Sequence, residues 1–118
     1  MSEKLKLYHN PRCRKSREAL NLLTENSVKF DTVLYLKQPP SKETVAWIFD
    51  TFSGSSDDLI RKNEAVWKKN FKGKTMSKET LVEAVIEHPI LLERPLLITQ
   101  KNVILGRPLE NISIYLQH

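Results

Sequence analysis

The sequence predicts an α/β fold, a mixed sheet interrupted by a helical insertion. Three observations predict it: an opening strand, helix and strand; a middle third with helical periodicity; and a last third of two short strands and a helix. The order β-α-β, helices, β-β-α is typical of a sheet that combines a parallel crossover with an antiparallel hairpin. Because 118 residues is an ordinary size for one domain, we expect a single domain over residues 1–118.

The opening β-α-β unit rests on alternation and helical spacing. Residues 4–8 alternate polar and apolar side chains, which predicts a half-buried strand. Asn10 and Pro11 then suit a helix start, because asparagine caps helices and proline fits their first turn. Residues 13–25 carry apolar side chains at helical spacing, and the apolar residues of 28–36 predict a second strand. We expect the two strands to be parallel.

The helical insertion is expected over about residues 41–88. It follows a proline pair at 39–40, which neither a helix nor a central strand accepts. The tetrapeptide Ser-Lys-Glu-Thr begins at Ser41 and again at Ser77, and a serine cap followed by an acidic first turn favours a helix start. The flanking sequences differ, so we predict two capped helices, not a repeat. Residues 57–71 predict an irregular helical segment between them.

The last third has shorter elements. Residues 96–99 and 103–105 predict an antiparallel hairpin of short strands, and residues 109–116 predict a closing helix with Ile112 and Leu116 facing inward. A mixed sheet of this kind can place the end of its first strand beside the turn that precedes the hairpin.

Composition and charge narrow the setting. The longest nearly apolar stretch, residues 89–99, is interrupted by charges and prolines, and it is far shorter than the roughly 20 apolar residues of a membrane span. The start has no signal-peptide apolar region, and the single cysteine cannot form an internal disulfide, so we expect a cytoplasmic protein in a reducing compartment. A net charge of +5 makes anionic partners plausible, although a lysine excess is usually solvated surface.

Cys13 is the candidate nucleophile. It lies just after a predicted strand at the first turn of a helix, with Arg12, Arg14, Lys15 and Arg17 close by in sequence. Unpaired N–H groups at a helix start and neighbouring cations both stabilise a thiolate. We therefore predict a lowered pKa and a reactive thiol rather than a buried structural cysteine.

Two common cysteine chemistries are excluded by the spacing. Ser16 stands where a Cys-x-x-Cys dithiol needs its second cysteine, and Ala19 stands where a Cys-x5-Arg phosphatase loop needs its arginine. What remains is a thiolate whose covalent intermediate is released by an external thiol or by water. The Ser16 hydroxyl could donate to that thiolate, and His9 could tune it. A helix-surface serine and a backbone-bonded structural histidine are the alternatives.

Two distant arginines each stand directly before a proline. The backbone of Arg94 and Arg107 is therefore favoured to be extended, which holds each side chain in a fixed direction suited to binding an oxyanion. Surface arginines before a turn are the alternative.

Several motifs together carry a family resemblance. They are Tyr8-His-Asn-Pro-Arg-Cys13 with Ser16-Arg17, Leu59-Ile-Arg61, Glu93-Arg-Pro-Leu-Leu-Ile98 and Gly106-Arg-Pro108. In this order and spacing they resemble the arsenate reductases of the glutathione- and glutaredoxin-coupled type, within the thioredoxin-like superfamily. The resemblance covers nearly the whole chain, and it implies a thioredoxin-like mixed sheet with a helical insertion.

The resemblance also implies a reaction. Cys13 would attack arsenate, and Arg61, Arg94 and Arg107 would form the oxyanion site. Glutathione would then attack the arsenic adduct, arsenite would leave, and glutaredoxin would clear the mixed disulfide. Glutathione is thus a co-substrate, with arsenate or a similar oxyanion as ligand, and no metal or bound cofactor is expected.

Three further residues match positions of the same family. His9 and Ser16 match positions implicated in tuning the thiolate, and Pro95 matches the cis-proline that faces the active site.

Two other functions stay open. One is a glutathione-dependent thiol oxidoreductase or redox sensor of the same fold. The other is a non-enzymatic binding module, since a related branch of the superfamily regulates transcription by contacting RNA polymerase. This chain lacks the Cys-x-x-Cys switch of that branch and any basic stripe interleaved with aromatic residues, so we expect no nucleic-acid partner.

Overall fold

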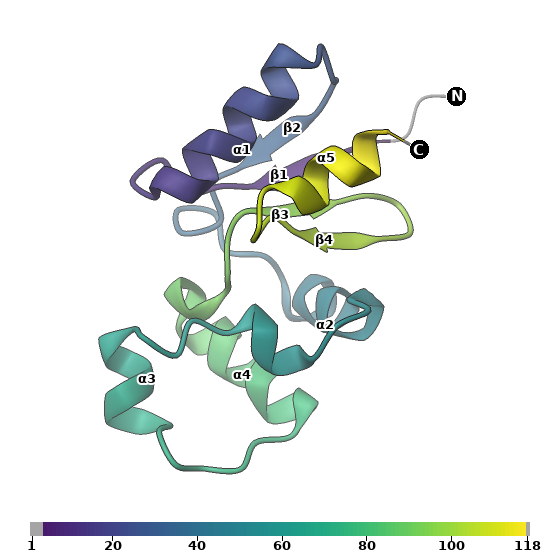
Figure 1. The fold of residues 1–118 in the computed structure, drawn as a ribbon. Helices are drawn as coiled ribbons and strands as arrows, with labels where there is room; N and C mark the ends of the chain where they lie inside the picture. The colour runs from purple at the N-terminus through teal and green to yellow at the C-terminus, as the bar shows by residue number, and fades with distance from the viewer. Residues whose placement is uncertain (1–3, 118) are drawn as a thin grey trace. The chain divides into compact units, whose positions relative to one another are not determined.

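The computed structural model describes residues 4–117, which fall into two compact units (Figure 1). The sheet unit contains the described residues up to Gln38 and those from Arg94 onward, and the helical unit contains Pro39–Glu93. None of the helices in this part of the chain is long and apolar enough to cross a membrane. The expectation of one domain over the whole chain stays a prediction.

The sheet unit contains four short strands in the order β2-β1-β3-β4. They are β1 (Lys6–Tyr8), β2 (Asp31–Val33), β3 (Leu96–Ile98) and β4 (Val103–Leu105). β1 runs parallel to β2 and antiparallel to β3, which pairs with β4 as an antiparallel hairpin. The parallel opening and the closing hairpin expected from sequence are both confirmed.

The second strand is shorter than the predicted residues 28–36, because the residues at both ends of that range form turns instead. The N–H of Val28 donates to the carbonyl of Leu23 at 3.1 Å, in a turn that closes the preceding helix. At the other end, the carbonyl of Leu34 accepts from the N–H groups of Lys37 and Gln38, at 2.9 Å each. Backbone groups held in these turns are not available for strand pairing.

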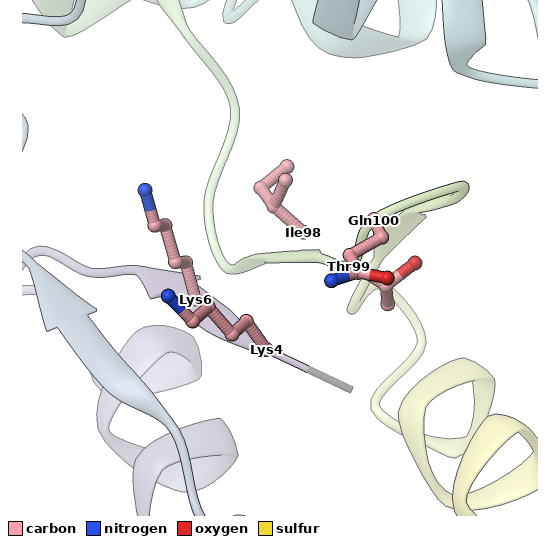
Figure 2. Close-up of a pocket in the computed structure, with 5 residues that line it drawn as sticks. All are labelled: Lys4, Lys6, Ile98, Thr99 and Gln100. Atoms are coloured by element: carbon pink, nitrogen blue, oxygen red, sulfur yellow. The ribbon is translucent and has the colours of Figure 1, made fainter. Parts of the chain in front are cut away.

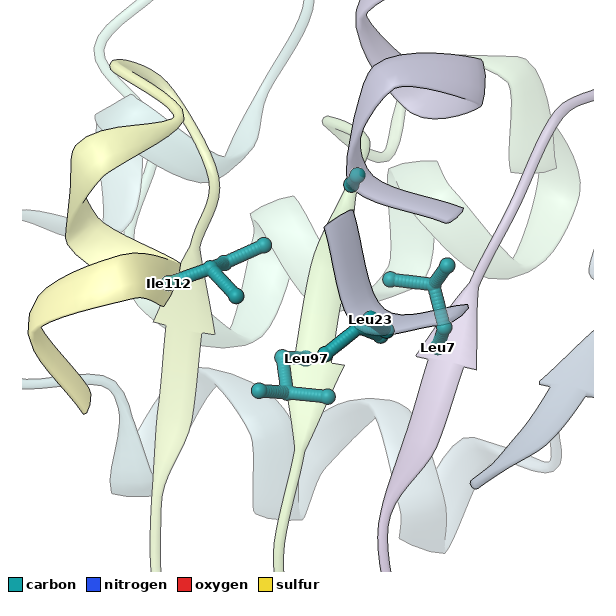
Figure 3. Packing of buried hydrophobic residues seen from close by; sticks show 5 residues of the cluster. Leu7, Leu23, Leu97 and Ile112 are labelled. Carbon is teal, nitrogen blue, oxygen red and sulfur yellow. The ribbon is translucent and has the colours of Figure 1, made fainter. Parts of the chain in front are cut away.

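Helices α1 (Arg14–Glu25) and α5 (Glu110–Leu116) pack on one face of the sheet. Leu7 of β1 and Leu97 of β3 are cross-strand partners, so their side chains lie on the same face. They pack in one cluster with Leu23 of α1 and Ile112 of α5, and Figure 3 shows these four side chains. The fully buried members of this core are Leu7, Ala19, Leu23, Leu97 and Ile112. Burying each leucine contributes about 1.5–3 kcal/mol.

The helical unit contains three α-helices and two 3-10 turns. They are α2 (Lys42–Thr51), a turn at Ser56–Leu59, α3 (Ala65–Asn70), α4 (Lys78–Glu87) and a turn at Pro89–Leu91. Ser41 and Ser77 cap α2 and α4, and each hydroxyl accepts the N–H three residues on at 3.2 Å. The two capped helices expected from the repeated tetrapeptide are confirmed.

Candidate active site

The pairing of the strands brings three chain segments to one end of the sheet. Tyr8, where β1 ends, is paired with Leu96, where β3 begins, and Leu96 is paired with Leu105, where β4 ends. Cys13 follows β1 by five residues, Arg94 precedes β3 by two, and Arg107 follows β4 by two. Residues far apart in sequence therefore lie at the same end of the sheet.

A tight loop places Cys13 at the start of a helix. Asn10 accepts the Cys13 N–H at its carbonyl, at 2.9 Å, and the Arg12 N–H at its side-chain oxygen, at 3.1 Å. Cys13 is the N-cap of α1 and has extended backbone, with φ −94° and ψ 122°. The predicted location of the thiol at a helix N-terminus is confirmed.

Two guanidinium groups contact the sulfur of Cys13. Arg107 donates from Nη2 to Sγ at 3.4 Å, and Arg94 also forms a side-chain hydrogen bond with Cys13. The cysteine itself is half-buried. The site therefore joins a nucleophilic atom to two charged, forked donors, an arrangement suited to a tetrahedral oxyanion.

The pKa of Cys13 lies below its ordinary value. Burial raises the pKa of this thiol, but a hydrogen bond from the Ser16 N–H and the guanidinium groups of Arg94 and Arg107 lower it by more. The predicted lowering of the Cys13 pKa is thus confirmed. The expected cause, the helix start and the cations adjacent in sequence, was incomplete. Two of the cations next to Cys13 in sequence have other partners: Arg14 pairs with Glu18 at 3.4 Å, and Arg17 donates to the carbonyl oxygen of Pro11 at 2.9 Å.

Backbone contacts within the sheet unit hold the two arginines. Nε of Arg107 donates to the carbonyl oxygen of Arg94 at 2.7 Å, so the backbone of Arg94 helps to position the Arg107 side chain. The Arg94–Pro95 and Arg107–Pro108 peptide bonds are both cis. Gly106 packs so closely that a Cβ there would lie 2.8 Å from a side-chain carbon of Pro95 and 2.8 Å from one of Ile112. A larger residue at this position would require Pro95 or Ile112 to shift.

Ser16 is fully buried, which contradicts the alternative of a surface serine. Its hydroxyl oxygen accepts the Asn10 N–H at 3.0 Å and lies 2.6 Å from Nδ1 of His9. The group that bonds Cys13 is instead the Ser16 N–H. The expected hydroxyl-to-thiolate bond is therefore replaced by a backbone bond, while the hydroxyl ties the loop to His9.

His9 is buried behind this loop. Burial and the positive charge of Arg17 lower the pKa of His9, and a hydrogen bond with the backbone of Ser16 opposes them only partly. The imidazole is consequently neutral at pH 7, and its Nδ1 can accept the Ser16 hydroxyl proton. The His9 N–H also donates to the carbonyl of Val33 at 3.0 Å, so the histidine is anchored by its backbone as well.

Arg17 secures the same loop from outside. Its Nη1 donates to the carbonyl oxygen of Pro11 at 2.9 Å, across the turn that leads to Cys13. Although it is a close sequence neighbour of the cysteine, its contacts give it a role in holding the loop and in keeping His9 neutral.

Arg61 belongs to the helical unit, where two carboxylates bind it. Its Nη1 lies 2.6 Å from Oε1 of Glu93, and its Nε lies 3.0 Å from Oε2 of Glu64. The prediction that Arg61 contributes to the oxyanion site therefore stays a prediction. These ion pairs mean that an oxyanion would have to share Arg61 with two carboxylates.

Sequence reasoning missed one residue of the site, Tyr35. Its side chain is fully buried, its hydroxyl accepts from Nη1 of Arg94 at 3.4 Å, and its ring stacks on that of Tyr8 at 6.0 Å between centroids. Tyr35 sits in a segment that the sequence assigns to a strand, where an aromatic residue is unremarkable. No local signal distinguishes it.

A cavity of about 240 Å³ lies at the opposite end of β1 and β3 (Figure 2). Its lining is formed by Lys4, Lys6, Ile98, Thr99 and Gln100. Neither Cys13 nor an arginine lines it, and the site at Cys13 lies at the other end of the same two strands.

Known proteins resemble this chain over nearly its whole length. A model of the ArsC family matches residues 8–115. A protein of Escherichia coli (strain K12) named "Uncharacterized protein YfgD" is 39% identical over 114 residues, which are 95% of this chain and 96% of that protein. A protein of Neisseria meningitidis serogroup A named "Arsenate reductase" is 36% identical over 114 residues, which are 95% of this chain and 97% of that protein.

A solved structure gives the same picture. The arsenate reductase from Vibrio cholerae matches with a TM-score of 0.87 and 30% identity, over 97% of this chain and 98% of that one. This likeness confirms the expected α/β, thioredoxin-like fold.

Proposed function

The chain belongs to the ArsC family, and on that premise we propose that it reduces arsenate to arsenite through Cys13. The observation that carries the proposal is a thiol of lowered pKa in contact with two guanidinium groups. A thiolate is the nucleophilic form of cysteine, and forked cations are the usual partners of a tetrahedral oxyanion. If Cys13 were only a structural cysteine, its thiol would not require a guanidinium group beside it.

The first step forms a sulfur–arsenic bond. The Cys13 thiolate attacks the arsenic atom, and one arsenate oxygen leaves as water after taking up protons. Arsenate is mostly a dianion near neutral pH and would repel a thiolate. Arg94 and Arg107 offset that repulsion, because they bind the oxyanion and the sulfur in the same place. Arg61 is proposed as a third oxyanion donor.

The second step transfers two electrons to arsenic. The glutathione thiolate attacks the Cys13 sulfur, the sulfur–arsenic bond breaks, and its electron pair stays with arsenic, which leaves as arsenite. The product on the protein is a mixed disulfide between Cys13 and glutathione. A glutaredoxin thiolate then attacks the glutathione sulfur and returns Cys13 to its thiolate form.

The cysteine count supports an external thiol as the reductant. Cys13 is the only cysteine in the chain, so the resolving thiol must come from outside it. Glutathione and glutaredoxin supply two such thiols in sequence, in the reducing cytoplasm that we expect for this protein.

Arsenite formation tests the proposal directly. We expect the wild type to form arsenite from arsenate with glutathione and glutaredoxin, and Cys13→Ser to form none. Equal rates for the two proteins would remove Cys13 from the mechanism, and an inactive wild type would remove arsenate as the substrate. Replacing glutathione and glutaredoxin with thioredoxin and its reductase separates the two reductants.

A glutathione-dependent thiol oxidoreductase or redox sensor is the second candidate. It is favoured by the same two guanidinium groups, which can bind a carboxylate of glutathione beside the thiolate as readily as an oxyanion. In that case oxidised glutathione would modify Cys13 rapidly without any oxyanion present. Slow modification would count against this candidate.

A further inference from the structure

The positive charge of this protein is concentrated in one short segment. Between positions 61 and 76 lie six of the nineteen Lys and Arg residues but only one of the fourteen Asp and Glu residues. The formal charge of this segment is therefore +5, which equals that of the whole chain. The rest of the chain is neutral in sum.

The same segment forms a cavity of about 420 Å³ within the helical unit. It lies along α3 and the turn that follows, and we name it the lysine cavity. Its lining includes Asn63, Trp67 and four lysines, Lys62, Lys68, Lys72 and Lys74. Gly73 completes the lining with φ +82°, and a Cβ built there would meet no atom within 4 Å, so the space beside its backbone is open. The volume lies in the range of small-ligand sites.

Carboxylates balance only one of the four lysines. Lys62 pairs with Asp57 at 3.1 Å, and its Nζ also lies 5.6 Å from the centre of the Trp67 ring. Within residues 4–117, Lys68, Lys72 and Lys74 form no ion pair. Lys68 has a structural role in the last turn of α3, where a cation stabilises the helix carbonyls. Lys72 and Lys74 lie beyond the helix and have no such role.

We propose that the lysine cavity binds a ligand that carries two or more linked phosphate groups. Ammonium groups bind phosphate as point charges, and several of them around one concavity repel each other until an anion enters. Linked phosphates place several negative charges within a volume of this size. A single tetrahedral anion would reach fewer of the three unpaired lysines at once.

The aromatic residues favour phosphate over a nucleic-acid strand. Single-stranded nucleic acids bind through exposed rings on which their bases stack. Trp67 is only 7% exposed, because Phe71 packs against it at 5.4 Å between centroids and Lys62 lies over its ring. No open ring face is left in the cavity for a base, so recognition rests on charge.

Calorimetric titration at constant ionic strength tests this proposal. We expect inorganic triphosphate to bind at least tenfold more tightly than orthophosphate. Trp67 reports the location: in a Trp47→Phe background it is the only tryptophan, and its fluorescence should change with the same midpoint as the heat. If pyrophosphate and ADP bind with equal affinity, the cavity recognises the phosphates alone. If ADP binds more tightly, the ligand that carries the phosphates is a nucleotide.

A charge-matched pair of variants separates a site from general attraction. We expect Lys72→Gln/Lys74→Gln to weaken triphosphate binding about tenfold, which is about 1.4 kcal/mol for two lysines and is ordinary for exposed ion pairs. Lys29→Gln/Lys37→Gln removes the same charge from the sheet unit and should weaken it less than twofold. Equal effects of the two variants, equal binding of triphosphate and orthophosphate, or tighter binding of an oligonucleotide through these lysines would each overturn the proposal.

Discussion

Replacing Arg107 with glutamine should raise the pKa of Cys13. The substitution removes a positive charge whose Nη2 lies 3.4 Å from the sulfur. It also removes the bond from Nε to the carbonyl oxygen of Arg94, which holds the Arg107 side chain in place. The lost charge raises the pKa, because a nearby positive charge stabilises the thiolate and not the neutral thiol.

The distance sets the magnitude. Two unit charges 3.4 Å apart attract by about 1.2 kcal/mol in bulk water and by about 5 kcal/mol at an effective dielectric constant of about 20. Because both residues are partly exposed, we take the lower figure as the expected loss. A loss of about 1.2 kcal/mol lowers the thiolate fraction of Cys13 about eightfold, at any pH below the pKa of this thiol in both the wild type and Arg107→Gln.

The assay is the ultraviolet absorbance of the thiolate across a pH titration, with Cys13→Ser as the blank. Arg107→Lys keeps a charge but not the planar fork, and it should retain more thiolate than Arg107→Gln. Arg14→Gln, which removes an exposed cation adjacent in sequence, should leave the titration unchanged. A change of less than twofold in Arg107→Gln, or an equal change in Arg14→Gln, would refute the reasoning.

Three further predictions concern the packing behind the thiol. Ser16→Ala removes the buried hydroxyl that bonds His9, and it should lower the free energy of unfolding in urea by about 1–3 kcal/mol. Gly106→Ala forces a methyl group against Pro95 and Ile112, and it should cost about 1–3 kcal/mol by the same measurement. Because the pKa of His9 is lowered in the folded protein, its contribution to stability should be complete above its unfolded value of about 6.5 and lost as pH falls through the folded value.

A specific result would contradict each of these three predictions. A Ser16→Ala protein as stable as the wild type would mean that the hydroxyl exchanges its bonds with water at no cost. A neutral Gly106→Ala would mean that α5 can shift away from β4. For His9, the histidine signals in nuclear magnetic resonance give its pKa directly, and a value at or above 6.5 would contradict the neutral assignment.

Local signals in the sequence predicted the order of the elements and the position of Cys13, the candidate nucleophile. Period-two and helical spacing depend only on neighbouring residues, and so do serine caps such as Ser41 and Ser77. Cys13 lies at a helix start because the residues around it favour that start. The ends of the second strand were less predictable, since turns made by Leu23 and Leu34 compete with strand pairing there.

The environment of the thiol was decided by tertiary structure. The sequence drew attention to the cations beside Cys13, yet the sulfur is bonded by Arg107, 94 residues away. Strand pairing brings the two together, because β1 pairs with β3 and β3 pairs with β4, and no local pattern encodes such pairing. The sequence by itself thus singled out Cys13 as the candidate nucleophile and placed it at a helix start. The tertiary structure decided which charges stabilise it, since electrostatic stabilisation depends on distance in space and not on separation along the chain.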